Sequence, residues 1–188
     1  MFIFMKIQFI FSNIYENVIS KKPITPEKAL KARLIIERAW KKEGKKIIHS
    51  LEKITGLCFQ KDELCYLNSK ASFSQPLSIK IEDSKTMLDN LTHELIHVLL
   101  TQNYGKIERP MKLFHTKWEK YNFTTRIHIL VHAIHLELAE QIFPNRTKHI
   151  VGYSTNRNYR TSWEIVMKYG HKKLIGGFKN LSNLSHSY

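Results

Sequence analysis

The chain has 188 residues, 43% of them hydrophobic and 11% aromatic, so it can bury a core and is not expected to be disordered. No apolar run reaches the roughly 18 residues that a membrane-spanning helix needs. The chain carries 30 Lys and Arg against 16 Asp and Glu, a net charge of +14 that permits contact with nucleic acid or an anionic surface. These basic residues are scattered, so no motif supports a nucleic-acid partner.

The N-terminal eleven residues are apolar but interrupted by Lys6, with neither a basic leader nor a small-residue cleavage site. We expect a strand or a helix packed on the core there, not a signal peptide, and a cytoplasmic protein. Cys58 and Cys65 are separated by six residues, which is neither a zinc-ribbon nor a redox spacing. Two reduced cysteines are therefore expected.

The sequence Thr25-Pro26-Glu27 predicts the start of a helix, since it combines a capping hydroxyl, a proline at the first helical position and an acidic first turn. Helical spacing continues to Trp40, and a second stretch covers residues 45–55, with Gly44 either ending the first helix or only weakening it. Short apolar runs and a strict alternation at residues 77–81 predict strands between residues 57 and 81.

Three more helices are predicted downstream. Apolar residues recur at helical spacing from Met87 to Leu99 and again from Ile127 to Phe143, where Pro144 ends the pattern. A third helix is expected over residues 161–169. The fold class is α+β: a small, mostly antiparallel sheet packed with N-terminal helices, followed by two helices that bear histidines. We expect one domain over residues 1–188, with a core at about 24–170 and a flexible tail at 176–188.

The helix predicted around residue 95 contains His93, Glu94 and His97 in the pattern His-Glu-x-x-His. Residues four apart on a helix project from the same face, so the two imidazoles can bind one metal ion, with zinc as the expected ion. Glu94 lies one step round the helix and can hydrogen-bond a water molecule at the metal without binding the metal itself. These residue types indicate hydrolysis by an activated water.

A catalytic zinc site takes three protein ligands and leaves one position for water. On the second histidine-bearing helix, His128, His132 and His135 share one face, at about 0°, 40° and −20° around the axis. Glu137, at about 180°, points away and Glu140 lies on the flank at about 120°. The spacing therefore predicts that the third ligand is a histidine.

The motif helix, preceded by a small sheet and followed by a second helix, resembles the zincin metallopeptidases, and the element order is most similar to the gluzincin branch. In that branch the third ligand is a Glu near the start of the second helix, and an acidic residue four positions later orients a motif histidine. His128 and His132 stand at these two positions, and both depart from the family pattern. The resemblance covers residues 77–143 and implies a minimal zincin-like fold.

A second branch, the SprT-like metalloproteases, has its third histidine in a segment similar to His-Gly-x-x-Trp after the motif helix. Here the segment Phe114-His115-Thr116-Lys117-Trp118 has the His and the Trp, with Thr116 in place of the glycine. The third ligand is thus expected to be His128, with His132 as an alternative or orienting residue and His115 as a further alternative. The transition state also needs a hydrogen-bond donor to the developing oxyanion. The sequence does not distinguish among four candidates for this donor: Tyr153, Arg157, Tyr159 and His149.

These observations predict a zinc-dependent metallopeptidase in which Glu94 is the catalytic base and His93, His97 and His128 bind Zn²⁺. Its partner would be a peptide or protein substrate. The alternative is an inactive zincin-like or basic module that binds nucleic acid or protein and has a structural metal site.

Overall fold

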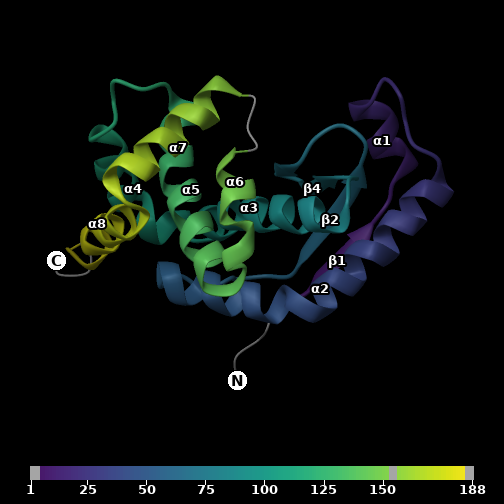
Figure 1. Cartoon of the computed structure of the whole chain (residues 1–188), viewed down its shortest axis with the longest axis horizontal. Helices are drawn as coiled ribbons and strands as arrows, with labels where there is room; N and C mark the ends of the chain where they lie inside the picture. Colours follow the sequence, from purple (N-terminus) through teal and green to yellow (C-terminus); the bar gives the residue numbers. More distant parts are fainter. Residues whose placement is uncertain (1–4, 153–155, 185–188) are drawn as a thin grey trace. The chain divides into compact units, whose positions relative to one another are not determined.

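The computed structural model describes residues 5–152 and 156–184. It divides into two compact units, the first made of residues 1–49 and 59–99, the second of residues 50–58 and 100–188. Figure 1 shows their elements and labels most of them. In chain order they are β1 (Ile7–Ile10), α1 (Asn13–Ile19), α2 (Pro26–Thr55), β2 (Glu63–Asn68), β3 (Phe73–Ser74), β4 (Leu77–Lys80), α3 (Ser84–Gln102), α4 (Tyr104–Thr116), α5 (Phe123–Ile142), the short 3₁₀ helix η1 (Pro144–Arg146), α6 (Thr147–Gly152), α7 (Arg157–Tyr169) and α8 (His171–Leu184).

The first unit is built on a four-stranded sheet with the order β1-β2-β4-β3. Helices accompany this sheet, which confirms the α+β class. The prediction of a mostly antiparallel sheet is wrong, because β1 pairs with β2 and β2 with β4 in parallel, and only β3 and β4 are antiparallel. The reason is the connections: α1 and α2 return the chain between β1 and β2, and β3 returns it between β2 and β4, so all three strands run the same way.

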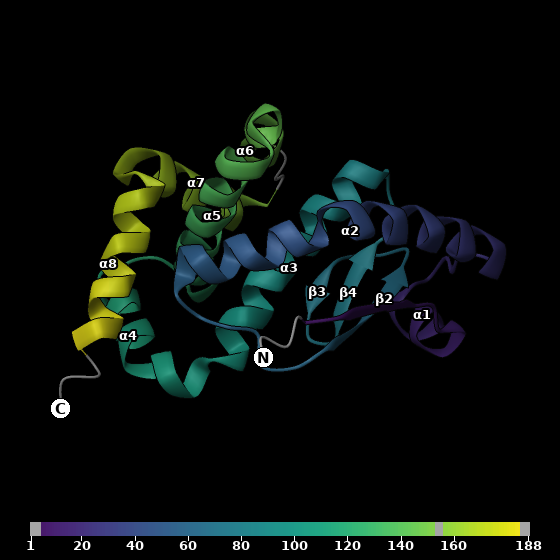
Figure 2. The same cartoon turned by 90° about the horizontal axis from the view of Figure 1, so that it is seen from below.

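Helix α2 runs unbroken through the position where the sequence allowed a break. Gly44 stays helical, and a Cβ atom there would lie only 2.5 Å from the ring of Trp40. The indole of Trp40 in turn meets the ring of Phe9 on β1 edge to face, with ring centroids 6.5 Å apart. A glycine at residue 44 therefore lets the Trp40 ring lie flat along α2, which runs beside the sheet (Figure 2).

A buried carboxylate ties the short helix α1 to the end of β2. Glu16 is 1% exposed, and its oxygens accept hydrogen bonds from the backbone N–H groups of Ile24 and Ser69, both 3.1 Å away, and from the Ser69 hydroxyl. Burying a charge costs free energy unless it is hydrogen-bonded in this way. The core of this unit consists of side chains that are at most 2% exposed, among them Phe9, Ile36, Ile47, Leu67, Ile79, Leu91 and Leu95.

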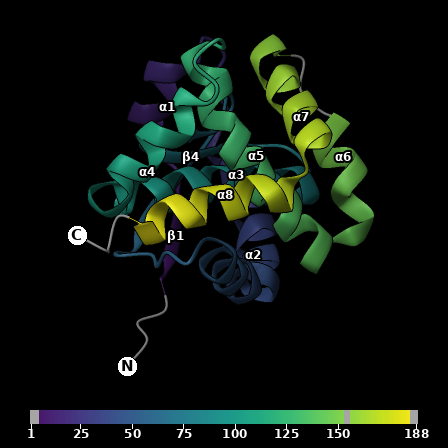
Figure 3. The same ribbon diagram turned by 90° about the vertical axis from the view of Figure 1, so that its left-hand side faces the viewer.

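The second unit is helical. Helix α5 packs against α7 and α8, and α8 also packs against α4. Figure 3 shows α8 in yellow beside α4. Asn122 caps α5 by accepting a hydrogen bond from the backbone N–H of Thr125 at 2.9 Å, and Pro144 follows its end, as predicted. Gly170, with φ of 83°, turns the chain between α7 and α8, a backbone conformation that costs glycine little.

The expectation of a flexible tail from residue 176 is wrong for residues 176–184, which belong to α8. Phe178 is 1% exposed and meets Phe114 of α4 edge to face, at 6.3 Å between ring centroids. This buried aromatic outweighs the local preference of the Gly, Ser and Asn residues around it. Residues 185–188 lie outside the described part of the chain. Over the described residues, no helix combines the length and apolarity needed to cross a membrane.

Candidate metal centre

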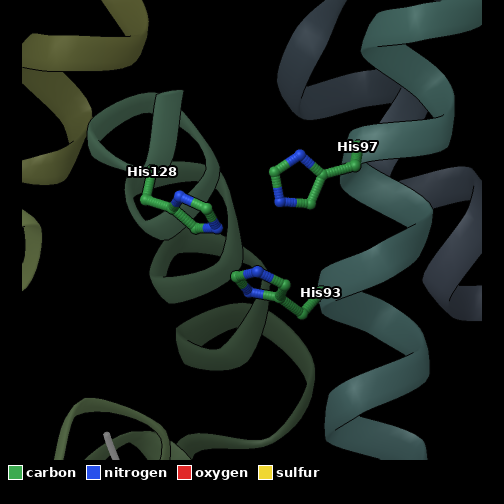
Figure 4. Close-up of side chains that lie close together, drawn as sticks. All are labelled: His93, His97 and His128. Carbon is green, nitrogen blue, oxygen red and sulfur yellow. The ribbon is translucent and has the colours of Figure 1, made fainter. Parts of the chain in front are cut away.

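Helix α3 presents its two motif histidines on one face. The helix begins after Asp83, whose carboxylate accepts hydrogen bonds from the backbone N–H and the hydroxyl of Thr86, and these bonds lower the pKa of Asp83. The imidazoles of His93 and His97 are half-buried, with ring centroids 5.1 Å apart and planes at 63° (Figure 4). The four-residue spacing therefore gives the paired arrangement that the sequence predicts.

Glu94 is half-buried on the same helix. Burial raises its pKa from the ordinary 4.5 to about 8. A carboxyl group with a pKa near neutrality is suited to general acid–base chemistry, and such shifts are concentrated at functional sites.

Burial, with a smaller contribution from the charge of Glu94, also raises the pKa of the Cys65 thiol on β2. Cys65 therefore stays protonated at neutral pH, a form that does not bind metal.

His128 occupies the first turns of α5, and a backbone contact determines which of its nitrogens carries hydrogen. Its Nδ1 lies 2.7 Å from the carbonyl oxygen of Thr124. A carbonyl oxygen only accepts, so Nδ1 must donate its N–H, and the neutral ring presents the lone pair of Nε2. Burial lowers the pKa of His128 and thereby favours this neutral form. A histidine held in this way is prepared for metal ligation, because such ligands usually donate their other N–H to a carbonyl or carboxylate.

His132 is part of the packing between α5 and α7. Its ring stacks on Trp163, with centroids 4.1 Å apart and planes at 6°, and its Nδ1 lies 2.8 Å from the hydroxyl oxygen of Ser162. The Ser162 hydroxyl donates its hydrogen to the carbonyl of Tyr159, also at 2.8 Å, so His132 Nδ1 is the donor toward Ser162. These contacts hold the ring of His132, which is 1% exposed, firmly within the second unit.

The remaining histidine candidate, His115, lies in the last turn of α4. Burial lowers the pKa of His115, and the positive charge of Arg126 lowers it further.

Of the suggested oxyanion donors, Tyr159 lies over the His128 ring at 4.1 Å between centroids. Tyr153 and the side chain of His149 lie outside the described part of the structure.

Sequence reasoning identified the histidines of α3 and α5 but missed what orients them. Thr124, Ser162 and Trp163 supply those contacts. Only Thr124 could have been found from sequence, because it lies four residues before His128, the spacing at which a side chain reaches the backbone of the preceding turn.

No protein-family model, curated protein or solved structure significantly matches this chain.

Proposed function

We propose that this protein is a zinc-dependent metallopeptidase with His93, His97 and His128 as metal ligands and Glu94 as the general base. The observation that carries the proposal is the arrangement on α3, where two imidazoles with centroids 5.1 Å apart share one face and the half-buried carboxyl group of Glu94 occupies the adjoining position. Three neutral imidazoles with one open position form a set that suits catalytic zinc.

His128 is the proposed third ligand because its Nδ1–H is already given to the carbonyl of Thr124. Figure 4 draws the three proposed ligands, His93 and His97 from α3 and His128 from α5. His132 stabilises the helix that carries His128, through Ser162 and Trp163, and is an orienting residue in this proposal.

Zinc bound there would polarise a substrate carbonyl and lower the pKa of a water molecule. Glu94 would accept the proton of that water and donate it to the leaving amine. The tautomer of His128 holds Nε2 ready as a ligand, and the lowered pKa of His128 limits competition from protons.

The first experiment measures zinc by mass spectrometry in purified wild-type protein and in His93→Ala, His128→Ala, His132→Ala and His115→Ala. We expect one equivalent less zinc in the first two variants only, with His49→Ala, at an exposed position on α2, as a matched control. Loss of zinc from His132→Ala or His115→Ala, with zinc retained in His128→Ala, would reassign the third ligand.

The second experiment measures cleavage of casein and of a mixed fluorogenic peptide library. Glu94→Gln should keep the zinc and lose about 10²- to 10⁴-fold in kcat/KM, the usual contribution of a general base. Glu164→Gln, at an exposed position on α7, should keep full activity. Zinc binding with no Glu94-dependent cleavage across the library would contradict the catalytic role and leave a structural metal site.

The net charge of +14 favours a second candidate function, that of a module which binds nucleic acid. A gel-shift titration at two salt concentrations tests it. Binding that weakens steeply as salt increases would support this function, whereas no binding at low salt would eliminate it.

A further inference from the structure

Three ligand-type side chains of the second unit gather where α5 meets α8, on a face of α5 other than that of His128. His171 Nε2 lies 3.0 Å from Glu137 Oε2 and 3.3 Å from Glu140 Oε2. The side chains of His171 and Glu137 are only 15% and 16% exposed, and that of Glu140 is 44% exposed. The proposed catalysis uses none of the three.

Local structure places these groups together. Glu137 and Glu140 are three residues apart on α5, so their carboxylates share one face of the helix. That face is turned away from His128, by about 180° for Glu137. The turn at Gly170 makes His171 the first residue of α8, which packs on α5.

The contact between these groups is close but does not form good hydrogen bonds. Glu137 Oε2 and His171 Nε2 are both buried, and neither makes a hydrogen bond. The other carboxylate oxygen of Glu137 accepts from the side-chain amide of Gln141 at 2.6 Å, which orients Oε2 toward His171. Buried polar atoms without hydrogen bonds cost free energy, and a cation between them would remove that cost.

The distances agree with those between neighbouring ligands of one metal ion. Zinc binds imidazole nitrogen and carboxylate oxygen at about 2.0–2.2 Å, so two ligand atoms around it lie roughly 3.0–3.4 Å apart at angles of 90–109°. Both measured distances fall in this interval, and the three ligand atoms all lie within 4.8 Å of one another. Two carboxylates also neutralise a divalent charge.

We propose that Glu137, Glu140 and His171 form a second site for a divalent first-row transition metal, with zinc as the preferred ion, that links α5 to α8. The imidazole ligand selects zinc and similar ions over Mg²⁺ and Ca²⁺, which prefer oxygen ligands alone. The site stands on residues of the second unit only and does not depend on peptidase activity.

The test uses the full chain with the α3 histidines replaced, His93→Ala/His97→Ala, so that zinc has only the second site. Calorimetric titration with ZnCl₂ should give one equivalent, and excess Mg²⁺ should not compete. Adding Glu140→Gln or His171→Asn should weaken binding at least about 10-fold, a loss typical even of residues that only orient a ligand. Glu164→Gln is the matched carboxylate control and should leave the affinity unchanged.

Circular dichroism of each variant shows whether it folds, and Glu140→Gln provides a test at a half-exposed position if His171→Asn fails to fold. Zinc should also raise the Tm of the His93→Ala/His97→Ala protein and not that of the same protein with Glu140→Gln. Two results would overturn the proposal and leave a simple ion pair between His171 and the two carboxylates. One is the absence of stoichiometric zinc binding. The other is a zinc affinity that neither Glu140→Gln nor His171→Asn lowers relative to the His93→Ala/His97→Ala protein.

Discussion

Acidification should destabilise the protein through one buried histidine of α5. His135 is 4% exposed, and burial, with a smaller contribution from the charge of Arg146, lowers its pKa from the ordinary 6.5 to about 4. In the unfolded chain the same imidazole regains its ordinary value. The unfolded state therefore binds more protons than the folded state between about pH 6.5 and pH 4, so stability is full above pH 6.5 and is lost as the pH falls through this interval.

The size of the effect follows from the two pKa values. They differ by about 2.5, and each unit corresponds to about 1.36 kcal/mol, so the complete loss is about 3 kcal/mol. Between pH 7.5 and pH 4.5 most of this loss, about 2–3 kcal/mol, should appear. That is a large fraction of the roughly 5–15 kcal/mol by which domains are usually stable.

The assay is urea denaturation, followed by circular dichroism, of metal-free protein at several pH values between 4.5 and 7.5. The glutamine of His135→Gln cannot be protonated, so the stability of this variant should fall by about 2–3 kcal/mol less than that of the wild type across this range. His135→Leu gives the same comparison if the glutamine variant folds poorly. His49→Gln, at an exposed position, should follow the wild-type curve.

Other groups titrate in the same range, but they contribute equally to wild type and variant, so the difference between the two curves isolates His135. Parallel curves for wild type and His135→Gln would contradict this role of His135. They would mean that His135 gains a proton in the folded state as easily as in the unfolded chain.

Three further substitutions test the packing, each by urea denaturation at pH 7.5. Ser162→Ala removes the acceptor for His132 Nδ1 and should cost about 1–3 kcal/mol, the penalty for a buried donor left unpaired. A loss below about 0.5 kcal/mol would show that this hydrogen bond is unimportant. Gly44→Ala should destabilise by about 1–3 kcal/mol, because the new methyl group collides with the Trp40 ring. Gly177→Ala should stabilise by about 0.5–1 kcal/mol, since its methyl group would meet nothing within 4 Å. Stabilisation by both alanines would contradict the predicted collision.

The helices of the candidate site could be predicted because their signals are local. The apolar spacing, the cap at Asn122 and the stop at Pro144 act within a few residues of α5. The choice among the histidines of α5 could not be predicted in the same way. His128 and His132 share a face, and what distinguishes them is a backbone carbonyl for one, and Ser162 and Trp163, some thirty residues away, for the other.

Strand direction and the C-terminal helix were beyond local patterns for the same reason. Alternating side chains at residues 77–81 predict a strand but carry no information about whether its neighbour is parallel, which the connections decide. The glycines and serines after residue 176 indicate flexibility locally, yet Phe178 packs on Phe114, sixty-four positions earlier. A contact between positions so far apart is not visible in the local pattern.

The hydrogen bond from His128 to Thr124 joins a side chain to the backbone of its own helix. The tautomer of this imidazole is therefore an intrinsic property of the first turn of α5 and requires no dedicated partner residue. The ring ¹⁵N chemical shifts of His128 would then report, in nuclear magnetic resonance spectra, whether that turn is formed. Fraying of the helix start, for example through loss of the Asn122 cap, would exchange the two tautomers and change which nitrogen is offered.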